Sequence, residues 1–400
     1  MPTAIYLLGH TPYPPVSGGA KRAANIIDVL SERFDVTVLA ADDTASDGPR
    51  WAASARRLLV RRHARGPLIA DTLEGVIRGR HALLQRSIRA GVLESLEDAL
   101  ATMRPELVIL GRPFVGPFLE AALRTGAHVV VEADESLPKV AWGTVRSRYS
   151  PTRDRVRALI EAVFVLGRME RASYPRATEV WVSSDRERAA FSSFVDPDRL
   201  RVVPNVVDIP EGLPVAGPVT ALAFVGSYFY PPNEAAALEL IDSIAPAVRE
   251  RGGPRTVVLV GPAVTPGMIA AAARDREVRL LGEVPDVRAP LREAGVLVVP
   301  VRAGGGTRVK ILEGMAAGVP VVSTRLGIEG IAVQDGDQVL LAETAKEFAD
   351  QLLRLESDAG LRAGLVQRAY GFVSRANSAA VIRAAVWSDP PLGEMVPARG

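Results

Sequence analysis

Three consecutive glycines, residues 304–306, stand between an apolar stretch and a segment of helical character that begins near Arg308. Because glycine has no side chain, a backbone made of it can come close to a large polar ligand. The N-terminus of a following helix presents free N–H groups and the positive end of a dipole, and both favour phosphate. Arg308 and Lys310 add two positive charges, and the Glu313 carboxylate can accept hydrogen bonds from the two hydroxyls of a ribose. The spacing therefore predicts a nucleotide-sugar site, and we call residues 304–307 the glycine loop.

Lysine is rare in this chain, which makes Lys310 distinctive. Lysine occurs only at positions 21, 139, 310 and 346 among the 48 basic residues, so 48 minus 4 leaves 44 arginines. A lysine beside three glycines is therefore less easily explained by the composition of the chain alone. The net charge of +2 is close to balanced, and we expect no nucleic-acid partner.

The chain contains no cysteine. This excludes disulfides, zinc–thiolate sites and a thiol nucleophile, and it favours the reducing cytoplasm as the location. No apolar run reaches the roughly 18 residues that a membrane-spanning helix needs. The first residues lack the basic segment of a signal peptide and instead predict a strand.

An arginine-rich segment at residues 56–65 is predicted to form an amphipathic helix, with Leu58, Leu59 and Val60 on its apolar face. Such a helix could lie on an anionic membrane, which would make the protein membrane-peripheral, or receive a charged acceptor. A solvated helix in an arginine-rich protein is the alternative.

The sequence predicts no metal site. Two Asp-x-Asp matches, at 196–198 and 335–337, stand in turn-forming contexts, and the four histidines at 10, 63, 81 and 128 have no ligand spacing. We therefore expect neither a metal nor another cofactor. His10 is kept as a candidate for acceptor binding.

Four hundred residues are too many for one compact core and suit two α/β domains. Apolar strands alternate with helical patterns, which predicts parallel sheets covered by helices on both faces. The predicted domains are residues 1–208 and 220–372, joined by a proline- and glycine-rich linker at 209–219. A helix at about 375–388 is expected to pack back on the first domain, and residues 389–400 to form a disordered tail.

Two groups of residues follow predicted strands of the first domain. Gly18 and Gly19 lie in a loop at the sheet edge where such folds bind ligands, and they either line the cleft near a phosphate or form a plain turn. Glu132, Asp134 and Glu135 end a buried strand. They are candidates for binding the acceptor or for acting as a general base. The alternative is that they cap the N-terminus of the following helix.

These features resemble the GT-B glycosyltransferases, and within them the retaining enzymes of family 4 type, the glycosyl transferases of group 1. The matching motifs extend over nearly the whole chain, and their order and spacing are specific to the family. They are PVSGG at 15–19, VVPNVVD at 202–208, FVGS at 224–227, YPPN at 230–233, LVGP at 259–262, LGEVPD at 281–286, GGGTRVKILEGMAA at 304–317 and PVVST at 320–324.

The resemblance implies two Rossmann-like domains that face each other across a cleft. The C-terminal domain would hold a nucleotide-sugar donor, and the N-terminal domain would hold most of the acceptor. Glu313 would bind the ribose, and Arg308 and Lys310 would bind the diphosphate. The other donor-binding residues that it implies are Gly18, Gly19, Gly226, Glu283, Val284, Gly304, Gly305, Gly306 and Thr307.

Two positions depart from the family pattern. The family often has a glutamate that contacts the donor sugar where this chain has Gly305, and an arginine and a lysine where residues 227–229 stand. The diphosphate charge is therefore expected to have moved to Arg308 and Lys310, and the sugar contacts to N–H groups of the glycine loop. The nucleobase and the sugar stay open.

The implied activity is retaining transfer of a sugar from a nucleoside diphosphate to a hydroxyl acceptor, which could be a glycan, a lipid-linked molecule or a small natural product. The leaving phosphate would help to deprotonate the acceptor. Three alternatives remain open. They are a nucleotide-sugar 2-epimerase, a glycogen phosphorylase-like enzyme and a non-catalytic GT-B subunit that binds nucleotide.

Overall fold

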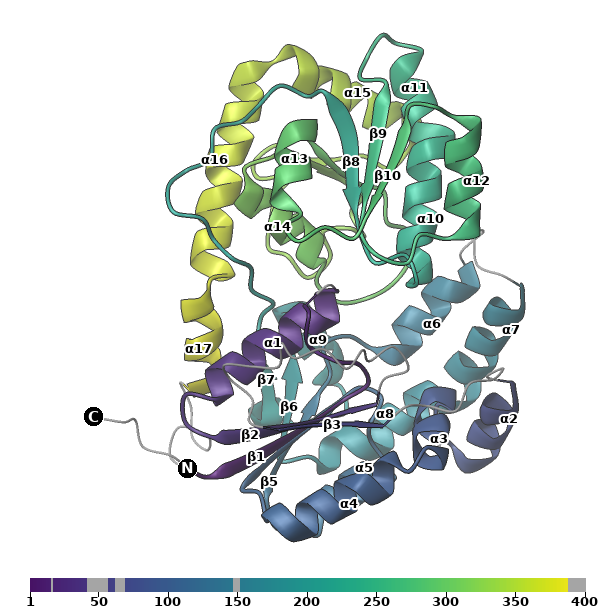
Figure 1. The fold of residues 1–400 in the computed structure, drawn as a ribbon, viewed down its shortest axis with the longest axis vertical. Coiled ribbons are helices and arrows are strands. Elements are labelled where there is room, and N and C mark those ends of the chain that lie inside the picture. The colour runs from purple at the N-terminus through teal and green to yellow at the C-terminus, as the bar shows by residue number, and fades with distance from the viewer. Residues whose placement is uncertain (16, 42–56, 62–68, 147–151, 388–400) are drawn as a thin grey trace.

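The computed structural model describes residues 1–15, 17–41, 57–61, 69–146 and 152–387. Figure 1 shows two α/β domains, one above the other, each built on its own parallel sheet. The expected α/β fold of two Rossmann-like domains is confirmed. The predicted tail at 389–400 lies outside the described residues.

The N-terminal sheet has seven parallel strands in the order β3-β2-β1-β4-β5-β6-β7. These strands are β1 (Thr3–Leu8), β2 (Asp35–Ala41), β3 (Arg57–Arg61), β4 (Leu107–Gly111), β5 (His128–Glu132), β6 (Glu179–Val182) and β7 (Leu200–Val202). The central strands β1, β4 and β5 are almost wholly buried. Buried strands are expected to be apolar throughout when helices cover both faces of a parallel sheet.

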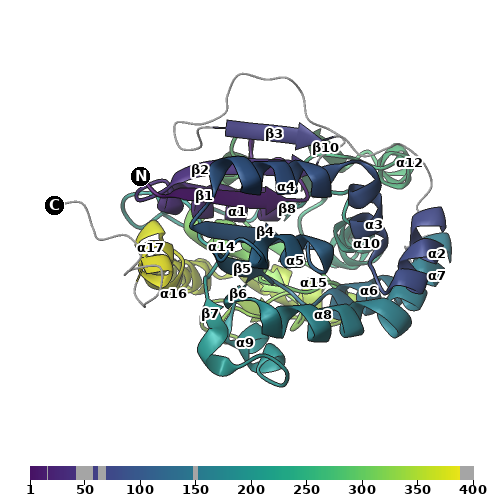
Figure 2. The same ribbon diagram turned by 90° about the horizontal axis from the view of Figure 1, so that it is seen from below.

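Helices cover both faces of this sheet. They are α1 (Gly18–Leu30), α2 (Ile69–Arg78), α3 (Ala82–Arg89), α4 (Val92–Met103), α5 (Pro117–Leu123), α6 (Leu137–Arg146), α7 (Thr152–Glu161), the π-helix η1 (Ala162–Leu166), α8 (Gly167–Ser173) and α9 (Asp185–Phe191). Figure 2 shows α4, α5 and α8 on the near face. Helix α1 lies on the other face, toward the second domain.

The C-terminal sheet has six parallel strands in the order β10-β9-β8-β11-β12-β13. These strands are β8 (Ala221–Val225), β9 (Thr256–Val260), β10 (Val278–Gly282), β11 (Leu297–Val299), β12 (Val321–Ser323) and β13 (Leu340–Leu341). The helices between and after them are α10 (Pro231–Glu239), η4 (Leu240–Ile244), α11 (Ala245–Arg249), α12 (Pro266–Arg274), α13 (Arg288–Ala294), α14 (Val309–Ala317), α15 (Ala345–Ser357), α16 (Ala359–Ala376) and α17 (Ala379–Trp387).

The last helix, α17, returns to the first domain and packs beside α1 (Figure 1). Trp387 stacks on Phe34 with ring centroids 6.3 Å apart. Arg383 pairs with Glu32 at the surface, at 2.7 Å. The chain therefore crosses between the domains twice, once after β7 and once after α16.

The predicted amphipathic helix at 56–65 is wrong. Residues 57–61 form strand β3, which pairs in parallel with β2 in the register Leu58↔Val38. A short apolar run fits a buried strand as well as a helix, and the free edge of β2 decides between them. The remaining residues of that segment lie outside the described part of the chain.

A buried ion pair ties α1 to the centre of the N-terminal sheet. Arg22 on α1 donates from Nε to Glu132 on β5 at 2.6 Å, and from Nη1 to the Val203 carbonyl at 2.7 Å. The Tyr6 hydroxyl of β1 donates to the other carboxylate oxygen of Glu132. Burial, reinforced by the charge of Glu132, raises the pKa of Tyr6. This network fixes the start of α1 relative to the strand ends.

We expect the Arg22→Met variant to lower the free energy of unfolding by about 3–5 kcal/mol, because it leaves the Glu132 carboxylate buried without its partner. Urea unfolding of the N-terminal domain measures this loss. Arg383→Met is the matched control, since its exposed pair with Glu32 contributes about 1 kcal/mol or less. Equal losses in the two variants would contradict the role of the Arg22 network.

Candidate functional site

The glycine loop follows β11 and leads into α14 at the edge of the C-terminal sheet that faces the first domain (Figure 1). Gly304 and Gly306 have φ angles of +96° and +68°, which glycine adopts without strain. The predicted order of strand, glycine loop, helix and strand is present as β11, the loop, α14 and β12.

The loop packs directly against the N-terminal domain. A Cβ atom on Gly305 would lie 2.7 Å from Oε2 of Glu135, and a Cβ on Gly143 of α6 would lie 2.7 Å from the Gly304 nitrogen. Such distances are too short for carbon atoms, so these positions accept only glycine unless a neighbour moves. The absence of side chains is what lets the two domains meet here.

The N-termini of two helices from opposite domains lie close together beside this loop. A Cβ on Gly18, the first residue of α1, would be 3.6 Å from Cγ2 of Val309, the first residue of α14. Gly19 lies against His10, whose Cε1 would be 3.2 Å from a Cβ at that position. Both helix dipoles therefore present their positive ends to the same place, which favours an anion.

An ion pair joins the same two helices. Lys21 of α1 pairs with Glu313 of α14, and Glu313 is mostly buried, with 13% of its side chain exposed. Glu329 forms a second link between the domains through Lys139 and Arg186. The predicted ribose residue thus lies at the domain interface, where its carboxylate already accepts a hydrogen bond.

Lys310 lies on the first turn of α14 and reaches across to the start of α10. Its Nζ donates to Oδ1 of Asn233 at 2.7 Å and lies 4.1 Å from the ring centroid of Phe224. A Cβ on Gly226 would come within 3.1 Å of this nitrogen, so Gly226 leaves space for it. Burial lowers the pKa of Lys310 well below its ordinary value, and Arg308 lowers it further while Glu313 opposes.

Arg308 turns back over its own loop. Its guanidinium donates to the carbonyl oxygens of Gly304, at 3.0 Å, and of Gly305 and Gly306. The side chain is buried, and these bonds set the shape of the loop. Its predicted contact with a diphosphate stays a prediction.

The three acidic candidates at the end of β5 differ in their surroundings. Glu132 faces the interior and is used by Arg22 and Tyr6. Asp134 pairs with Arg112, which also donates from Nη2 to Oε1 of Glu135 at 3.1 Å. Burial raises the pKa of Glu135, although Arg112 opposes the shift. Of the three, Glu135 is the one that touches the glycine loop.

The remaining donor candidates lie around the same edge. Thr307 contacts the first domain, since its carbonyl accepts from Asn205 at 3.5 Å and its hydroxyl donates to Ser183 at 3.5 Å. Glu283 is exposed after β10, and Val284 packs partly against the C-terminal core. Within the part of the chain that the structure describes, no hydrogen bond or ion pair joins Glu283 to the glycine loop.

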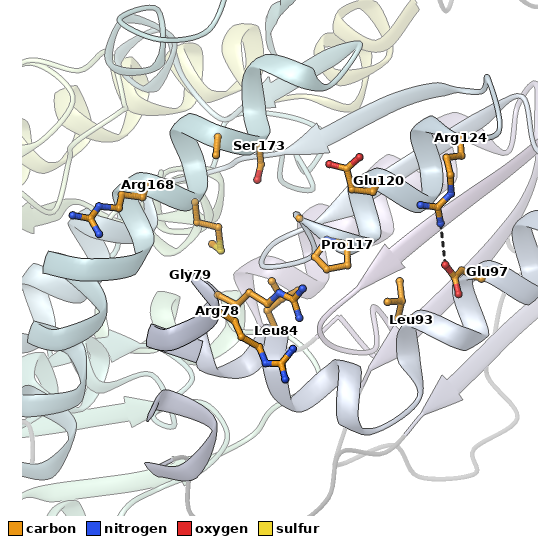
Figure 3. A pocket seen from close by; sticks show the side chains of 14 residues that line it. Arg78, Gly79, Leu84, Leu93, Glu97, Pro117, Glu120, Arg124, Arg168 and Ser173 are labelled. Atoms are coloured by element: carbon orange, nitrogen blue, oxygen red, sulfur yellow. Dashed lines mark hydrogen bonds and ion pairs between the residues drawn. The ribbon is translucent and has the colours of Figure 1, made fainter. Parts of the chain in front are cut away.

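A pocket of about 560 Å³ lies in the N-terminal domain, away from this site. Figure 3 shows Arg78, Arg124 and Arg168 around it, with Arg124 paired to Glu97 at 3.0 Å. None of the predicted site residues lines it. Within the described ranges, no three His, Cys, Asp or Glu residues are grouped so that they could hold a metal, and no helix has the length and apolar character to cross a membrane.

Residues 220–358 match the family described as glycosyl transferases group 1. This domain is a group 1 glycosyl transferase domain. It contains the glycine loop, Lys310 and Glu313, so the predicted group 1 family is confirmed for this domain. No curated protein matches the chain.

Solved structures similar to this chain cover both domains. Sucrose-phosphate synthase from Thermosynechococcus elongatus has a TM-score of 0.71 at 16% identity, with 98% of each chain covered. HepE from Anabaena, solved with UDP and glucose, has a TM-score of 0.64 at 18% identity, with 95% of this chain and 96% of HepE covered. WaaG, a glycosyltransferase involved in lipopolysaccharide biosynthesis, has a TM-score of 0.65 at 16% identity, with 95% and 98% covered. These likenesses establish the two-domain GT-B fold.

Sequence reasoning missed three residues of the site, Lys21, Tyr230 and Asn233. Lys21 was counted among the four lysines, and its place two residues after Gly19 was a signal that it belongs to the same helix N-terminus. Tyr230 and Asn233 stand in the YPPN motif, but nothing in the sequence indicated that they reach the glycine loop and Lys310.

Replacing Lys310 by methionine should raise the Kd of this protein for a nucleoside diphosphate about tenfold to a hundredfold, the effect of losing a hydrogen bond to a charged group. The ammonium form attracts the diphosphate, and its pKa is lowered in the free protein. Wild-type affinity should therefore fall as the pH rises through that lowered pKa, and the variant should lack this dependence.

Nucleoside diphosphates are first screened for the one that raises the Tm of the wild-type protein most. Isothermal titration with this ligand then measures the Kd and its dependence on pH. Lys346→Met, on the exposed surface of α15, is the control and should bind like wild type. An unchanged Kd in the Lys310 variant would contradict its role.

Proposed function

We propose that this protein is a retaining glycosyltransferase that moves a sugar from a nucleoside diphosphate to a hydroxyl acceptor. The observation that carries the proposal is the meeting of the α1 and α14 N-termini, with Lys310 and Glu313 beside them. Two helix N-termini and a lysine suit a diphosphate, and a carboxylate one turn along α14 suits a ribose.

The comparisons support a nucleotide-sugar donor. HepE from Anabaena was solved in complex with UDP and in complex with UDP-glucose. We infer a donor of this class for the present protein, held by the domain that matches the group 1 family. The nucleobase pocket would lie near Glu283 and Val284, at the end of β10.

The chemistry follows from the charge that develops during transfer. The bond between the anomeric carbon and the diphosphate oxygen breaks, and the electron pair stays on the leaving phosphate. Lys310 and the N–H groups at the start of α1 and α14 stabilise this negative charge. The acceptor oxygen forms the new bond to the anomeric carbon, and its proton passes to the leaving phosphate.

We expect the reaction to need no metal, so turnover should persist in EDTA.

The acceptor is proposed to enter from the side of the N-terminal domain. His10 lies against Gly19, and its Nε2 is buried without a hydrogen-bond partner. Asp134 lies near the glycine loop and has 27% of its side chain exposed. Either residue can orient an acceptor hydroxyl. The hydroxyl acceptor could belong to a glycan, a lipid-linked molecule or a small natural product.

We further propose a peripheral contact with an anionic membrane, made by α7 and η1 and not by the segment 56–65 that was expected from the sequence. Val156, Leu159 and Val163 are 51%, 41% and 49% exposed, and their spacing places them on one face of α7 and η1. Phe164 is 51% exposed beside them, and the Arg153 side chain, which lies 4.0 Å from the Asp154 carboxylate, is 84% exposed one turn earlier. Apolar and basic side chains on one helical face suit an anionic lipid surface.

Incubation of the wild-type protein with nucleotide sugar and acceptor should give a glycoside with the anomeric configuration of the donor, as read by proton NMR. Glu313→Ala should lower kcat/KM at least about a hundredfold, or about 2.8 kcal/mol, because the ribose loses its acceptor. Glu356→Ala, exposed on α15, is the control.

Near-normal turnover in Glu313→Ala would contradict the site assignment. A new sugar formed from donor alone would indicate the 2-epimerase, and nucleotide binding without hydrolysis or transfer would indicate a non-catalytic subunit.

Co-sedimentation with vesicles tests the membrane contact. Wild-type protein should bind vesicles that contain phosphatidylserine more strongly than neutral ones, and less strongly at high salt. The double variant Val163→Asp/Phe164→Asp should lose most of this binding while it keeps its turnover of a soluble acceptor. Equal binding of the variant and the wild type would contradict the proposed surface.

A further inference from the structure

The backbone conformation at Gly305 suits any residue, and one neighbouring side chain occupies the space around an added Cβ. Unlike Gly304 and Gly306, Gly305 has no positive φ angle. The three atoms nearest to a Cβ there all belong to Glu135, namely Oε2 at 2.7 Å, Cβ at 3.2 Å and Cδ at 3.6 Å. The Glu135 carboxylate therefore fills the space that a side chain at position 305 would occupy.

One oxygen of this carboxylate is held by a hydrogen bond, and the other has no hydrogen-bond partner. Oε1 of Glu135 accepts from Arg112 at 3.1 Å, and the Glu135 carbonyl accepts from the same guanidinium at 3.2 Å. Oε2 is buried and has no hydrogen-bond partner. Arg112 thus fixes the side chain and leaves one acceptor directed at the glycine loop.

A second unpartnered group lies on the other side of the loop. The hydroxyl of Tyr230, which precedes α10, is buried without a hydrogen-bond partner. A Cβ on Gly304 would be 2.6 Å from this hydroxyl. Burial raises the pKa of Tyr230, and the charge of Glu135 raises it further, so the phenol keeps its proton and can donate or accept.

Buried polar groups are usually hydrogen-bonded, and here two acceptor oxygens without partners lie against the same glycine loop, where one ligand can satisfy both. We propose that Glu135 and Tyr230 form the subsite for the hydroxyl groups of the donor sugar. The carboxylate accepts from one hydroxyl, and the phenol bonds to another. The carboxylate comes from the N-terminal domain, so the subsite is complete only while the two domains stand together. This proposal rests on the proposed function and assigns Glu135 to the donor rather than to the acceptor.

Because the Glu135 carboxylate lies against Gly305, a pair of substitutions can transfer the carboxylate from the N-terminal to the C-terminal domain. We would measure kcat/KM with a nucleotide sugar, and Kd for the matching nucleoside diphosphate, in Glu135→Ala, Gly305→Glu and the double variant. Glu135→Ala should lose about a hundredfold in kcat/KM, or about 2.8 kcal/mol, and keep its diphosphate Kd within about threefold. Gly305→Glu alone should also lose activity, because two carboxylates compete for one space.

The double variant Glu135→Ala/Gly305→Glu should recover at least about tenfold over Glu135→Ala. A structural role of Glu135, such as holding Arg112, would give no such recovery. A folded double variant, by its Tm, that is no more active than Glu135→Ala would overturn the proposal. Glu94→Ala, exposed on α4, is the control for an unrelated loss of carboxylate.

A second measurement does not depend on the double variant. Wild-type protein should prefer the natural nucleotide sugar over analogues that lack one sugar hydroxyl, and both Glu135→Gln and Tyr230→Phe should reduce this preference for a particular hydroxyl. Unchanged preferences in both variants would overturn the subsite. If wild-type protein turned over no nucleotide sugar, the proposed function itself would fail, and this outcome is distinct from either result above.

Discussion

The close approach of the two domains at the glycine loop is the constraint on which the site depends. Side chains at Gly305 or Gly143 would overlap atoms of the opposite domain, at distances of 2.7 Å. At Gly143 the overlap is with a backbone nitrogen, so only a backbone shift would relieve it, whereas at Gly305 the Glu135 side chain would have to move. Glycine at these positions therefore lets the ends of β5 and of β11 come together, and this contact places polar groups of both domains beside the glycine loop.

The electrostatics of the site follow from that contact. Helices α1 and α14 direct their N-termini at each other, and their partial positive charges would repel if nothing lay between them. Glu313 and Lys21 form an ion pair across the interface. Lys310, shifted toward its neutral form by burial, joins them. The site is arranged to receive negative charge, which a leaving diphosphate supplies.

The sequence predicted what depends on local patterns. It predicted the order of strands and helices, the two α/β domains and the glycine loop with Lys310 and Glu313. It did not predict the partners of these residues, because Tyr230 and Glu135 meet at the loop only after two distant segments fold and dock. The helix expected at 56–65 was wrong, since pairing with β2 made this short apolar run the edge strand β3.

The central claim is that parts of both domains hold one nucleotide sugar. A crystal structure of the wild-type protein with an intact nucleotide sugar tests it most directly. The account predicts a diphosphate beside Lys310 and the α14 N-terminus, a ribose on Glu313, and sugar hydroxyls within about 3.2 Å of Glu135 and Tyr230. A sugar that lies away from both side chains, or a diphosphate bound elsewhere, would contradict it.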